Sequence, residues 1–121
     1  MASRMETACA IVRLEPGSAD RARDWARHIA ENRDEAVRSL LNEGVVIESV
    51  FLGNDHEGDF LVYYMRASSI AEASKIARES TLAIDAYHRK FKESCWSSVA
   101  RIELLVDLVA FGAHGSTPRL A

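Results

Sequence analysis

Asp85 and His88 are the residues of this sequence whose types and spacing are best suited to chemistry. They stand three positions apart in a helical pattern, so their side chains lie close together on the helix surface. A carboxylate beside an imidazole can fix its tautomer and raise its basicity, which is the arrangement that a general base uses. The alternatives are a structural Asp–His hydrogen bond that joins this helix to its neighbour, or a helix cap made by Asp85. The spacing alone leaves all three open.

Four further polar residues are candidates for ligand binding. Arg33 falls among the apolar residues of a helical stripe, where its side chain either extends outward to solvent or reaches a carboxylate or a ligand. Glu48 and Arg66 lie in strand-like segments. Tyr63 and Tyr64 are adjacent, so they point to opposite faces of a strand and only one can face a cavity. Tyr64, with Arg33, Glu48 and Arg66, makes up the predicted ligand-binding set.

The sequence lacks the motifs of common cofactor and metal sites. It has no Gly-rich phosphate loop, nucleophile elbow or zinc motif. His28, His56 and His114 form no recognised metal-ligand spacing, so we expect neither a metal nor a cofactor. Cys9 and Cys95 share no CxxC spacing and are expected to be free thiols, buried as small hydrophobic side chains.

The bulk composition excludes several partners. A formal net charge of -3 argues against bulk binding of nucleic acid, which requires a clustered basic surface. No apolar run approaches the roughly 18 residues that span a membrane, and no signal-type apolar core follows the N-terminus. We therefore expect a cytoplasmic protein without nucleic-acid or membrane partners, folded as a single domain over residues 1–121.

The hydrophobic periodicity predicts the order β-α-β-β-α-β. Strands are expected over residues 7–14, 45–53, 60–66 and 99–111, with a turn over 53–58 that makes the middle two a hairpin. A long helix is expected from the N-cap Ser18 to about residue 42, stopped by Gly44. The second helical region is split: one helix opens at the capping box of Ser69 and Glu72, and another spans about 83–96. The ordered core is expected over about 6–111, followed by a flexible tail over 112–121.

This order is the ferredoxin-like split β-α-β pattern, an α+β fold with a four-stranded antiparallel sheet and its helices on one face. In the last strand the even-numbered residues 100–110 are apolar and should pack on the helices, whereas the odd-numbered residues are mixed. Residues 45–52 are apolar on both faces, and such a strand needs cover on both. We therefore expect a homodimer packed sheet against sheet. Glu48, Arg101, Glu103 and Asp107 would lie inside or at the rim of its shared cavity, or else pair across strands.

Several segments together resemble an uncharacterised bacterial family whose members look like dimeric α+β barrels. These are residues 9–16, 43–52 and 59–65, and the motif Asp85-x-Tyr87-His88-x-x-Phe91 followed by Cys95 and Trp96. The resemblance implies the barrel fold and no particular reaction. At superfamily level, similar barrels include cofactor-independent monooxygenases, lactone isomerases, haem-dependent dismutases and regulatory ligand-binding domains, although fold does not fix function. No histidine here is placed as a proximal haem ligand, so haem is not expected.

Two hypotheses of function follow. The first is a barrel that binds a small organic molecule and acts on it as a monooxygenase or an isomerase without a cofactor. His88 would be the base, oriented by Asp85, and the predicted ligand-binding set would position the substrate. The second is a non-catalytic dimerisation or interaction module, in which His88 is buried, fully hydrogen-bonded and without a cavity beside it. A cavity that reaches His88 separates the two.

Overall fold

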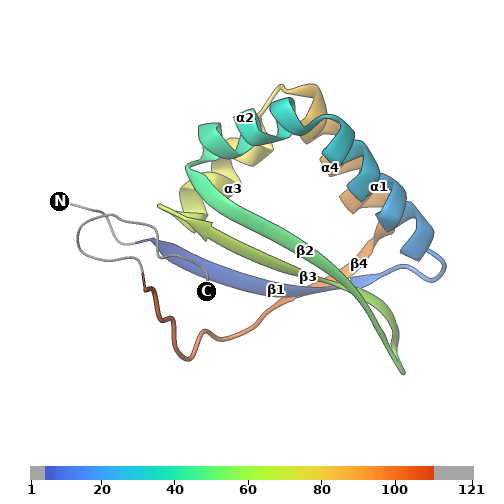
Figure 1. Cartoon of the computed structure of the whole chain (residues 1–121). Helices are drawn as coiled ribbons and strands as arrows, with labels where there is room; N and C mark the ends of the chain where they lie inside the picture. The colour runs from blue at the N-terminus through green and yellow to red at the C-terminus, as the bar shows by residue number, and fades with distance from the viewer. Residues whose placement is uncertain (1–4, 111–121) are drawn as a thin grey trace.

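The computed structural model describes residues 5–110, and its elements follow the predicted order. They are β1 (Glu6–Leu14), α1 (Ala19–Glu31), α2 (Arg33–Glu43), β2 (Val45–Asp55), β3 (Gly58–Ala67), α3 (Ile70–Glu79), α4 (Ala83–Cys95) and β4 (Trp96–Arg101). The strands form one antiparallel sheet in the order β2-β3-β1-β4, and the helices lie on one face of it (Figure 1). The predicted α+β architecture with helices on one face is therefore confirmed.

The first helical region is two helices, so the prediction of one long helix was wrong. The break lies at Asn32, whose backbone (φ -113°, ψ 40°) leaves the helical region. Its side-chain amide donates to the carbonyl of His28 at 2.9 Å, a local bond that competes with the helix ladder. Ser18 occupies the N-cap position but makes no side-chain cap, whereas Gly44 ends α2 as predicted, with a φ of 72°.

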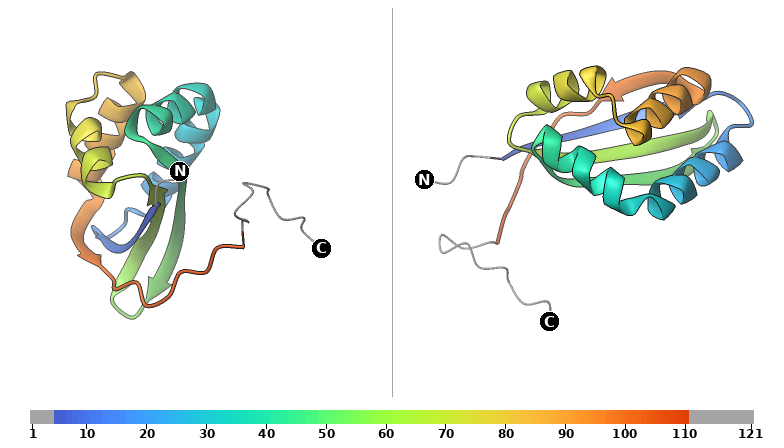
Figure 2. Two further views of the ribbon diagram at one scale, coloured as in Figure 1. Left: turned by 90° about the vertical axis from the view of Figure 1, so that its left-hand side faces the viewer. Right: turned by 90° about the horizontal axis from the view of Figure 1, so that it is seen from above.

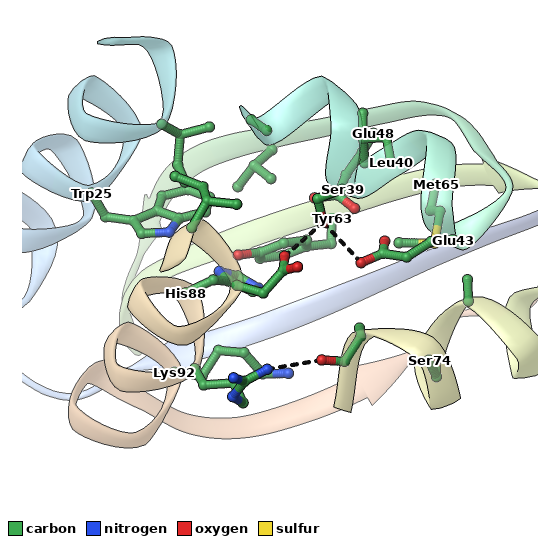
Figure 3. Close-up of a pocket in the computed structure, with 18 of the residues that line it drawn as sticks. Trp25, Ser39, Leu40, Glu43, Glu48, Tyr63, Met65, Ser74, His88 and Lys92 are labelled. Atoms are coloured by element: carbon green, nitrogen blue, oxygen red, sulfur yellow. Dashed lines mark hydrogen bonds between the residues drawn. The ribbon is translucent and has the colours of Figure 1, made fainter. Parts of the chain in front are cut away.

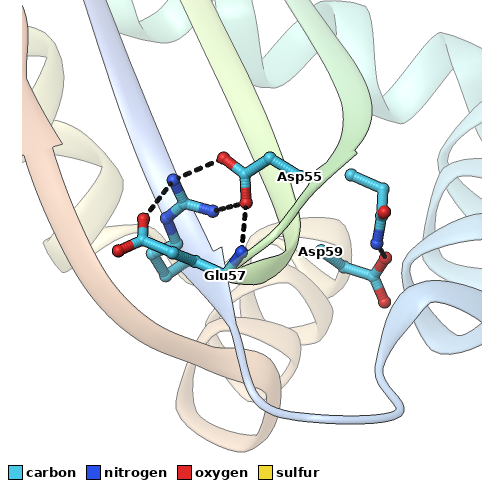
Figure 4. A network of polar contacts seen from close by, with 5 residues as sticks. Asp55, Glu57 and Asp59 are labelled. Atoms are coloured by element: carbon cyan, nitrogen blue, oxygen red, sulfur yellow. Dashed lines mark hydrogen bonds and ion pairs between the residues drawn. The ribbon is translucent and has the colours of Figure 1, made fainter.

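The predicted hairpin is confirmed, with a shorter turn than expected. β2 and β3 stay paired to Asp55 and Gly58, which leaves only residues 56–57 between the strands. Arg13 of β1 holds the hairpin end: its guanidinium donates to both oxygens of Asp55 at 2.8 and 2.9 Å and lies 3.1 Å from Glu57 (Figure 4). This bidentate pairing holds the pKa of Asp55 at about 2, below its usual range.

The capping box at the start of α3 is present in its N-cap half. The Ser69 hydroxyl accepts the backbone N–H of Glu72 at 3.1 Å. α3 therefore begins where the sequence predicted, one residue after the cap. α4 also lies close to its predicted range, and Cys95 at its end is fully buried, as expected, while Cys9 is half-buried.

The core consists of two separate clusters between helices and sheet. One is Val12, Leu14, Ala22, Trp25, Leu61, Phe91 and Cys95, and the other is Val45, Ala67, Ile70 and Ala73. The first joins α1 and α4 to the middle strands, and the second joins α3 to the ends of β2 and β3. The helix layer is thus anchored at two places (Figure 2).

The end of the chain departs from the prediction of a long final strand. β4 ends at Arg101, and one further backbone bond runs from the N–H of Ile102 to the carbonyl of Cys9 at 3.0 Å. We call residues 102–110 the C-terminal arm; it continues without a strand partner among the described residues (Figures 1 and 2). All its residues are exposed. The predicted tail over 112–121 lies outside the described residues.

The prediction that the even-numbered residues of the last strand pack on the helices was also wrong. Val99 and Arg101 pair with Val12 and Ala10 of β1. Opposite residues of an antiparallel pair share a face, and Val12 is buried beneath the helices, so Val99 and Arg101 are on the helix side. Alternation alone does not indicate which of its two faces meets the helices, and the apolar even-numbered residues 102–110 lie beyond the end of β4. No helix within residues 5–110 is both long and apolar enough to cross a membrane.

Candidate functional site

A pocket of about 600 Å³ opens between the helices and the sheet (Figure 3). It reaches members of both core clusters, Trp25 and Ala73, and all four helices line it. The helix faces that meet the sheet carry small side chains, Ala26, Ala36, Ser74 and Ala77, which leave room that larger residues would fill. This pocket lies on the opposite side of the sheet from the uncovered face, where the sequence predicted a cavity shared between two protomers.

Aromatic rings surround His88 at one end of the pocket. The ring of Trp25 lies 5.4 Å from the imidazole, and the rings of Tyr63 and Trp96 each lie 6.2 Å from it, measured between centroids. The ring of Phe91 stacks on the ring of Trp25, with their centroids 4.8 Å apart, and restricts the orientation of the indole. Figure 3 shows Trp25 and His88 at this end, Tyr63 in the middle and Glu43 toward the other end.

Four buried polar atoms on the pocket wall have no hydrogen-bond partner among residues 5–110. They are Trp25 Nε1, Tyr63 OH, His88 Nδ1 and Trp96 Nε1, and all four residues line the pocket. An unsatisfied buried polar atom costs about 1–3 kcal/mol, so four at one place call for an explanation. The indole nitrogens can only donate, the phenol can donate or accept, and the imidazole can do either according to its tautomer. The wall is therefore suited to a molecule with acceptor oxygens.

His88 is neutral in this environment. Burial lowers its pKa to about 4; the charges of Lys92 and Arg89 act in the same direction, and only Asp85 opposes them. Burial also raises the pKa of Tyr63, so its phenol keeps its proton and can serve as a donor. At neutral pH the aromatic end thus offers an uncharged imidazole, which can accept a proton, beside uncharged donors.

The predicted hydrogen bond between Asp85 and His88 is not formed among the described residues. Asp85 Oδ1 accepts the hydroxyl of Ser39 at 2.6 Å, and Asp85 Oδ2 accepts the hydroxyl of Ser80. Both oxygens are therefore engaged away from the imidazole. The helical spacing did bring the two side chains into one pocket, but α2 and the loop before α4 supply closer partners for the carboxylate.

Two more carboxyl groups lie in the same pocket. Glu43, at the end of α2, lies 3.1 Å from the Ser39 hydroxyl, and burial raises its pKa to about 7. Burial also raises the pKa of Glu48 on β2. Both carboxyls thus hold their protons to a higher pH than a carboxyl in water does.

Basic side chains from α4 line the remaining wall. The Arg89 guanidinium donates to the carbonyls of Ala77 and Ser80 at 2.9 and 3.0 Å, which ties α4 to the end of α3. The Lys92 ammonium lies 4.9 Å from the ring centre of Trp96, a cation–π distance. No group of three or more His, Cys, Asp or Glu within residues 5–110 could hold a metal ion.

The structure divides the predicted ligand-binding set. Glu48 lines the pocket, but Arg33 is exposed on α2 outside it. Tyr64 and Arg66 are on the uncovered face, where the Arg66 guanidinium donates to the Tyr64 hydroxyl at 3.2 Å and pairs with Asp107 of the C-terminal arm. Of the two adjacent tyrosines, Tyr63 is the one in the pocket.

Ser39 and Glu43 line the pocket but were not predicted from the sequence, although their spacing indicates a buried position. Ala36, Ser39, Leu40 and Glu43 stand at positions i, i+3, i+4 and i+7, the spacing of one helix face. Ser39 and Glu43 are therefore polar residues in a buried stripe, 6% and 8% exposed. Buried polar residues in such a stripe need partners: Ser39 contacts both Glu43 on the same helix and Asp85 on α4.

Comparison with known families identifies a relationship over most of the chain. Residues 5–112 match the model of a family of unknown function, DUF6176. The chain belongs to this family. The predicted resemblance to an uncharacterised family is thereby confirmed, while a comparison with curated proteins found no match.

Solved structures share the fold of this DUF6176 member at low sequence identity. A protein of unknown function from Bacteroides thetaiotaomicron, described as a possible oxidoreductase, is 17% identical, with a TM-score of 0.51 over 85% of this chain and 100% of that one. A dimeric ferredoxin-like protein of unknown function from Bacteroides fragilis is 12% identical (TM-score 0.51, 81% and 92% covered). A Mycobacterium tuberculosis protein is 18% identical (TM-score 0.53, 88% and 99% covered). This likeness supports the ferredoxin-like fold.

Proposed function

We propose that this protein binds a small, uncharged, unsaturated organic molecule in the pocket between helices and sheet. The observation that carries the proposal is the set of four unpartnered polar atoms on Trp25, Tyr63, His88 and Trp96 around one cavity. A volume of about 600 Å³ falls within the range of pockets that take small-molecule ligands. Aromatic walls favour a flat ligand, and the surplus of donors favours one with carbonyl or hydroxyl oxygens.

The chemistry best supported is removal of a proton from that molecule. His88 is uncharged and faces the cavity, so it can accept a proton from a C–H bond next to a carbonyl. The negative charge would move to the carbonyl oxygen, where the N–H and O–H donors of Trp25, Trp96 and Tyr63 are available to stabilise it. Return of a proton at another carbon completes an isomerisation, which needs no cofactor.

A cofactor-independent monooxygenase is the second candidate, favoured by the Bacteroides thetaiotaomicron neighbour described as a possible oxidoreductase. It would begin with the same deprotonation by His88. The resulting carbanion would reduce O₂, so that one oxygen atom enters the ligand and the other leaves as water. Oxygen consumption that depends on the ligand separates this reaction from isomerisation.

We also propose that the protein is a homodimer joined through the uncovered sheet face and the C-terminal arm. Phe51 is 60% exposed on that face, and Leu105 and Leu108 of the arm are 85% and 88% exposed. Apolar surface of this extent usually marks an interface. The Bacteroides fragilis neighbour is itself described as dimeric, which supports a second copy as the occupant.

A thermal-shift screen with matched tyrosine variants tests the binding proposal. The library should contain uncharged aromatic and enolisable carbonyl compounds, because a ligand that binds only the folded state raises the melting temperature. We expect hits with the parent protein and with Tyr64→Phe, which alters the uncovered face, and weaker shifts with Tyr63→Phe, which alters the pocket. No hits, or equal shifts in both variants, would support the non-catalytic interaction module.

A further inference from the structure

We propose that Glu43 is the second proton carrier of the pocket, an acid that holds its proton in the resting protein and donates it to the bound molecule. The inference rests on the proposed function, because it assigns the proton that isomerisation must return. It begins from the chain of contacts Glu43–Ser39–Asp85–Ser80, which crosses from α2 to α4 and the loop before it.

Counting protons along this chain shows which carboxyl is protonated. The Ser39 hydroxyl has one proton but lies within hydrogen-bond distance of two carboxyl groups, at 2.6 Å from Asp85 and 3.1 Å from Glu43. If both carboxyls were ionised, one contact would join two acceptors. Asp85 accepts two hydroxyl protons, from Ser39 and from Ser80. Glu43 has only Ser39 among the described residues, at 3.1 Å. Because the single hydroxyl proton goes to Asp85 at the shorter distance, we assign a proton to Glu43, which would then donate to Ser39 Oγ.

The surroundings of Glu43 favour the same assignment. Its side chain is buried, with the residue 8% exposed, and the nearest charged groups that act on it are the carboxyls of Asp85 on α4 and Glu48 on β2. Burial raises its pKa to about 7; the hydrogen bond with Ser39 acts in the opposite direction, and the charges of Asp85 and Glu48 act in the same direction as burial. The pocket wall also carries three cations, Arg78 of α3 and Arg89 and Lys92 of α4. Two further titratable groups, His88 and Tyr63, line the same pocket. Arg89 is already bonded to backbone carbonyls.

A second observation, independent of the carboxyl chain, points to a ligand in the space that Glu43 faces. Trp25 is 7% exposed, its Nε1 donor has no partner within residues 5–110, and it lines the same pocket from α1. A molecule held by this donor would have His88 beside it and Glu43 farther along the cavity (Figure 3). The pocket therefore presents a base and an acid to one ligand.

The reaction assigned to this pair is a double-bond shift in an unsaturated carbonyl compound. His88 takes a proton from one carbon, and the electrons of that C–H bond form the new C=C bond of an enolate. The enolate then takes the proton of Glu43 at a second carbon, so the ligand is isomerised without gain or loss of atoms. Glu43 is left as a carboxylate and His88 as an imidazolium, and both return to the resting state by proton exchange with solvent.

Infrared difference spectroscopy of the ligand-free protein tests where the proton resides. We expect the C=O band of a protonated carboxylic acid, lost as the pH rises with a midpoint near the pKa of about 7, in the parent protein. Glu48→Gln should keep this band but move its midpoint to lower pH, because the charge of Glu48 also raises the pKa of Glu43. The band should be absent from Glu43→Gln, and Asp85→Asn should move its midpoint to lower pH because one neighbouring charge is removed. A band with its midpoint near pH 7 that survives in Glu43→Gln and is lost in Glu48→Gln places the proton on Glu48 and overturns the assignment, even if ligands bind.

Deuterium incorporation into a screening hit in D₂O separates the acid from the base. His88→Gln should abolish both exchange and isomerisation. Glu43→Gln should retain binding and exchange at the carbon that His88 serves but form no isomerised product. If the carboxyl band titrates as expected and no compound binds, the proposed function fails and Glu43 is only a structural acid. If Glu43→Gln still forms product, another group returns the proton and the inference is wrong.

Discussion

Ser39 on α2 donates its hydroxyl proton to Asp85 on α4, with the two oxygens 2.6 Å apart. This bond joins two helices at the wall of the pocket and occupies one oxygen of the carboxylate that the sequence spacing pairs with His88. Because Ser80 occupies the other oxygen, the imidazole is left unpaired at Nδ1 and faces the cavity. Asp85 therefore does not form a dyad with His88 but belongs to a chain of hydroxyl and carboxyl groups.

The pH dependence of stability should reveal two opposing titrations. The pKa of Glu43 is raised from 4.5 to about 7, so the folded protein holds a proton that the unfolded chain has lost, and the unfolding free energy falls as pH rises across that window. The pKa of His88 is lowered from 6.5 to about 4, so the unfolded chain binds the proton first, and the unfolding free energy falls as pH drops across that window. The parent protein should therefore show a shallow profile where the windows overlap.

Single variants should separate these slopes. Glu43→Gln should stabilise the protein above neutral pH, by at most about 3 kcal/mol at roughly 1.4 kcal/mol per pKa unit, and leave a profile that falls toward acid. His88→Gln should leave a profile that falls toward alkaline pH, with Glu48 contributing in the same direction as Glu43. Urea unfolding across the pH range measures both. Parallel profiles in the two variants would contradict the assignment.

Removing the unpartnered phenol should not harm the ligand-free protein. Tyr63→Phe deletes a buried hydroxyl that has no partner among the described residues, so stability should be unchanged or higher by about 1 kcal/mol. Tyr64→Phe deletes the acceptor of Arg66 and should lower stability by about 1 kcal/mol. Denaturant midpoints of the two variants give the comparison. A marked loss in Tyr63→Phe would mean that its hydroxyl is already bonded in the ligand-free state.

Breaking the bridge between α2 and α4 should destabilise the protein. Ser39→Ala leaves the buried carboxyl of Glu43 and the half-buried carboxyl of Asp85 without their shared partner, at a cost of about 1–3 kcal/mol. Ser74→Ala is the matched control, because Ser74 lines the same pocket and is exposed. Thermal unfolding of both variants tests the difference, and equal midpoints would show that the bridge contributes nothing to stability.

Sedimentation should give a particle of twice the 13.4 kDa chain mass. Phe51→Lys places a charge on the uncovered face, and a chain that ends at Arg101 lacks the C-terminal arm; both should shift the equilibrium toward monomers. Leu41→Lys is the control, since Leu41 is 72% exposed but lies on α2, in the helix layer. A monomeric parent protein at micromolar concentration, or dimers unaffected by these changes, would refute the proposed interface.

Most of the fold was predictable because its signals are local. Gly44 needs a positive φ, and a Cβ there would meet the Ser68 hydroxyl at 2.8 Å, so the residue type alone predicts the end of α2. Ser69 and Glu72 likewise mark the start of α3. The break at Asn32 was missed because the apolar spacing continues across it, and only the backbone dihedrals show that two helices share the pattern.

The candidate site was predictable only in part. Asp85, His88 and Glu48 line the pocket, whereas Arg33, Tyr64 and Arg66 do not. The choice of Tyr64 over Tyr63 failed because alternation states that two neighbours face opposite sides, not which side contains a cavity. The same ambiguity of phase reversed the faces of β4.

The sequence by itself determined the order of elements, the antiparallel hairpin and the presence of an acid and a histidine near one another, because each depends on residues a few positions apart. Only the tertiary structure decided that the cavity lies under the helices, that Asp85 bonds Ser39 at a separation of 46 residues, and that Glu43 shares that hydroxyl. These relationships depend on how far α2 and α4 stand apart over the sheet. That separation is set by packing between distant segments, for which periodicity carries no information.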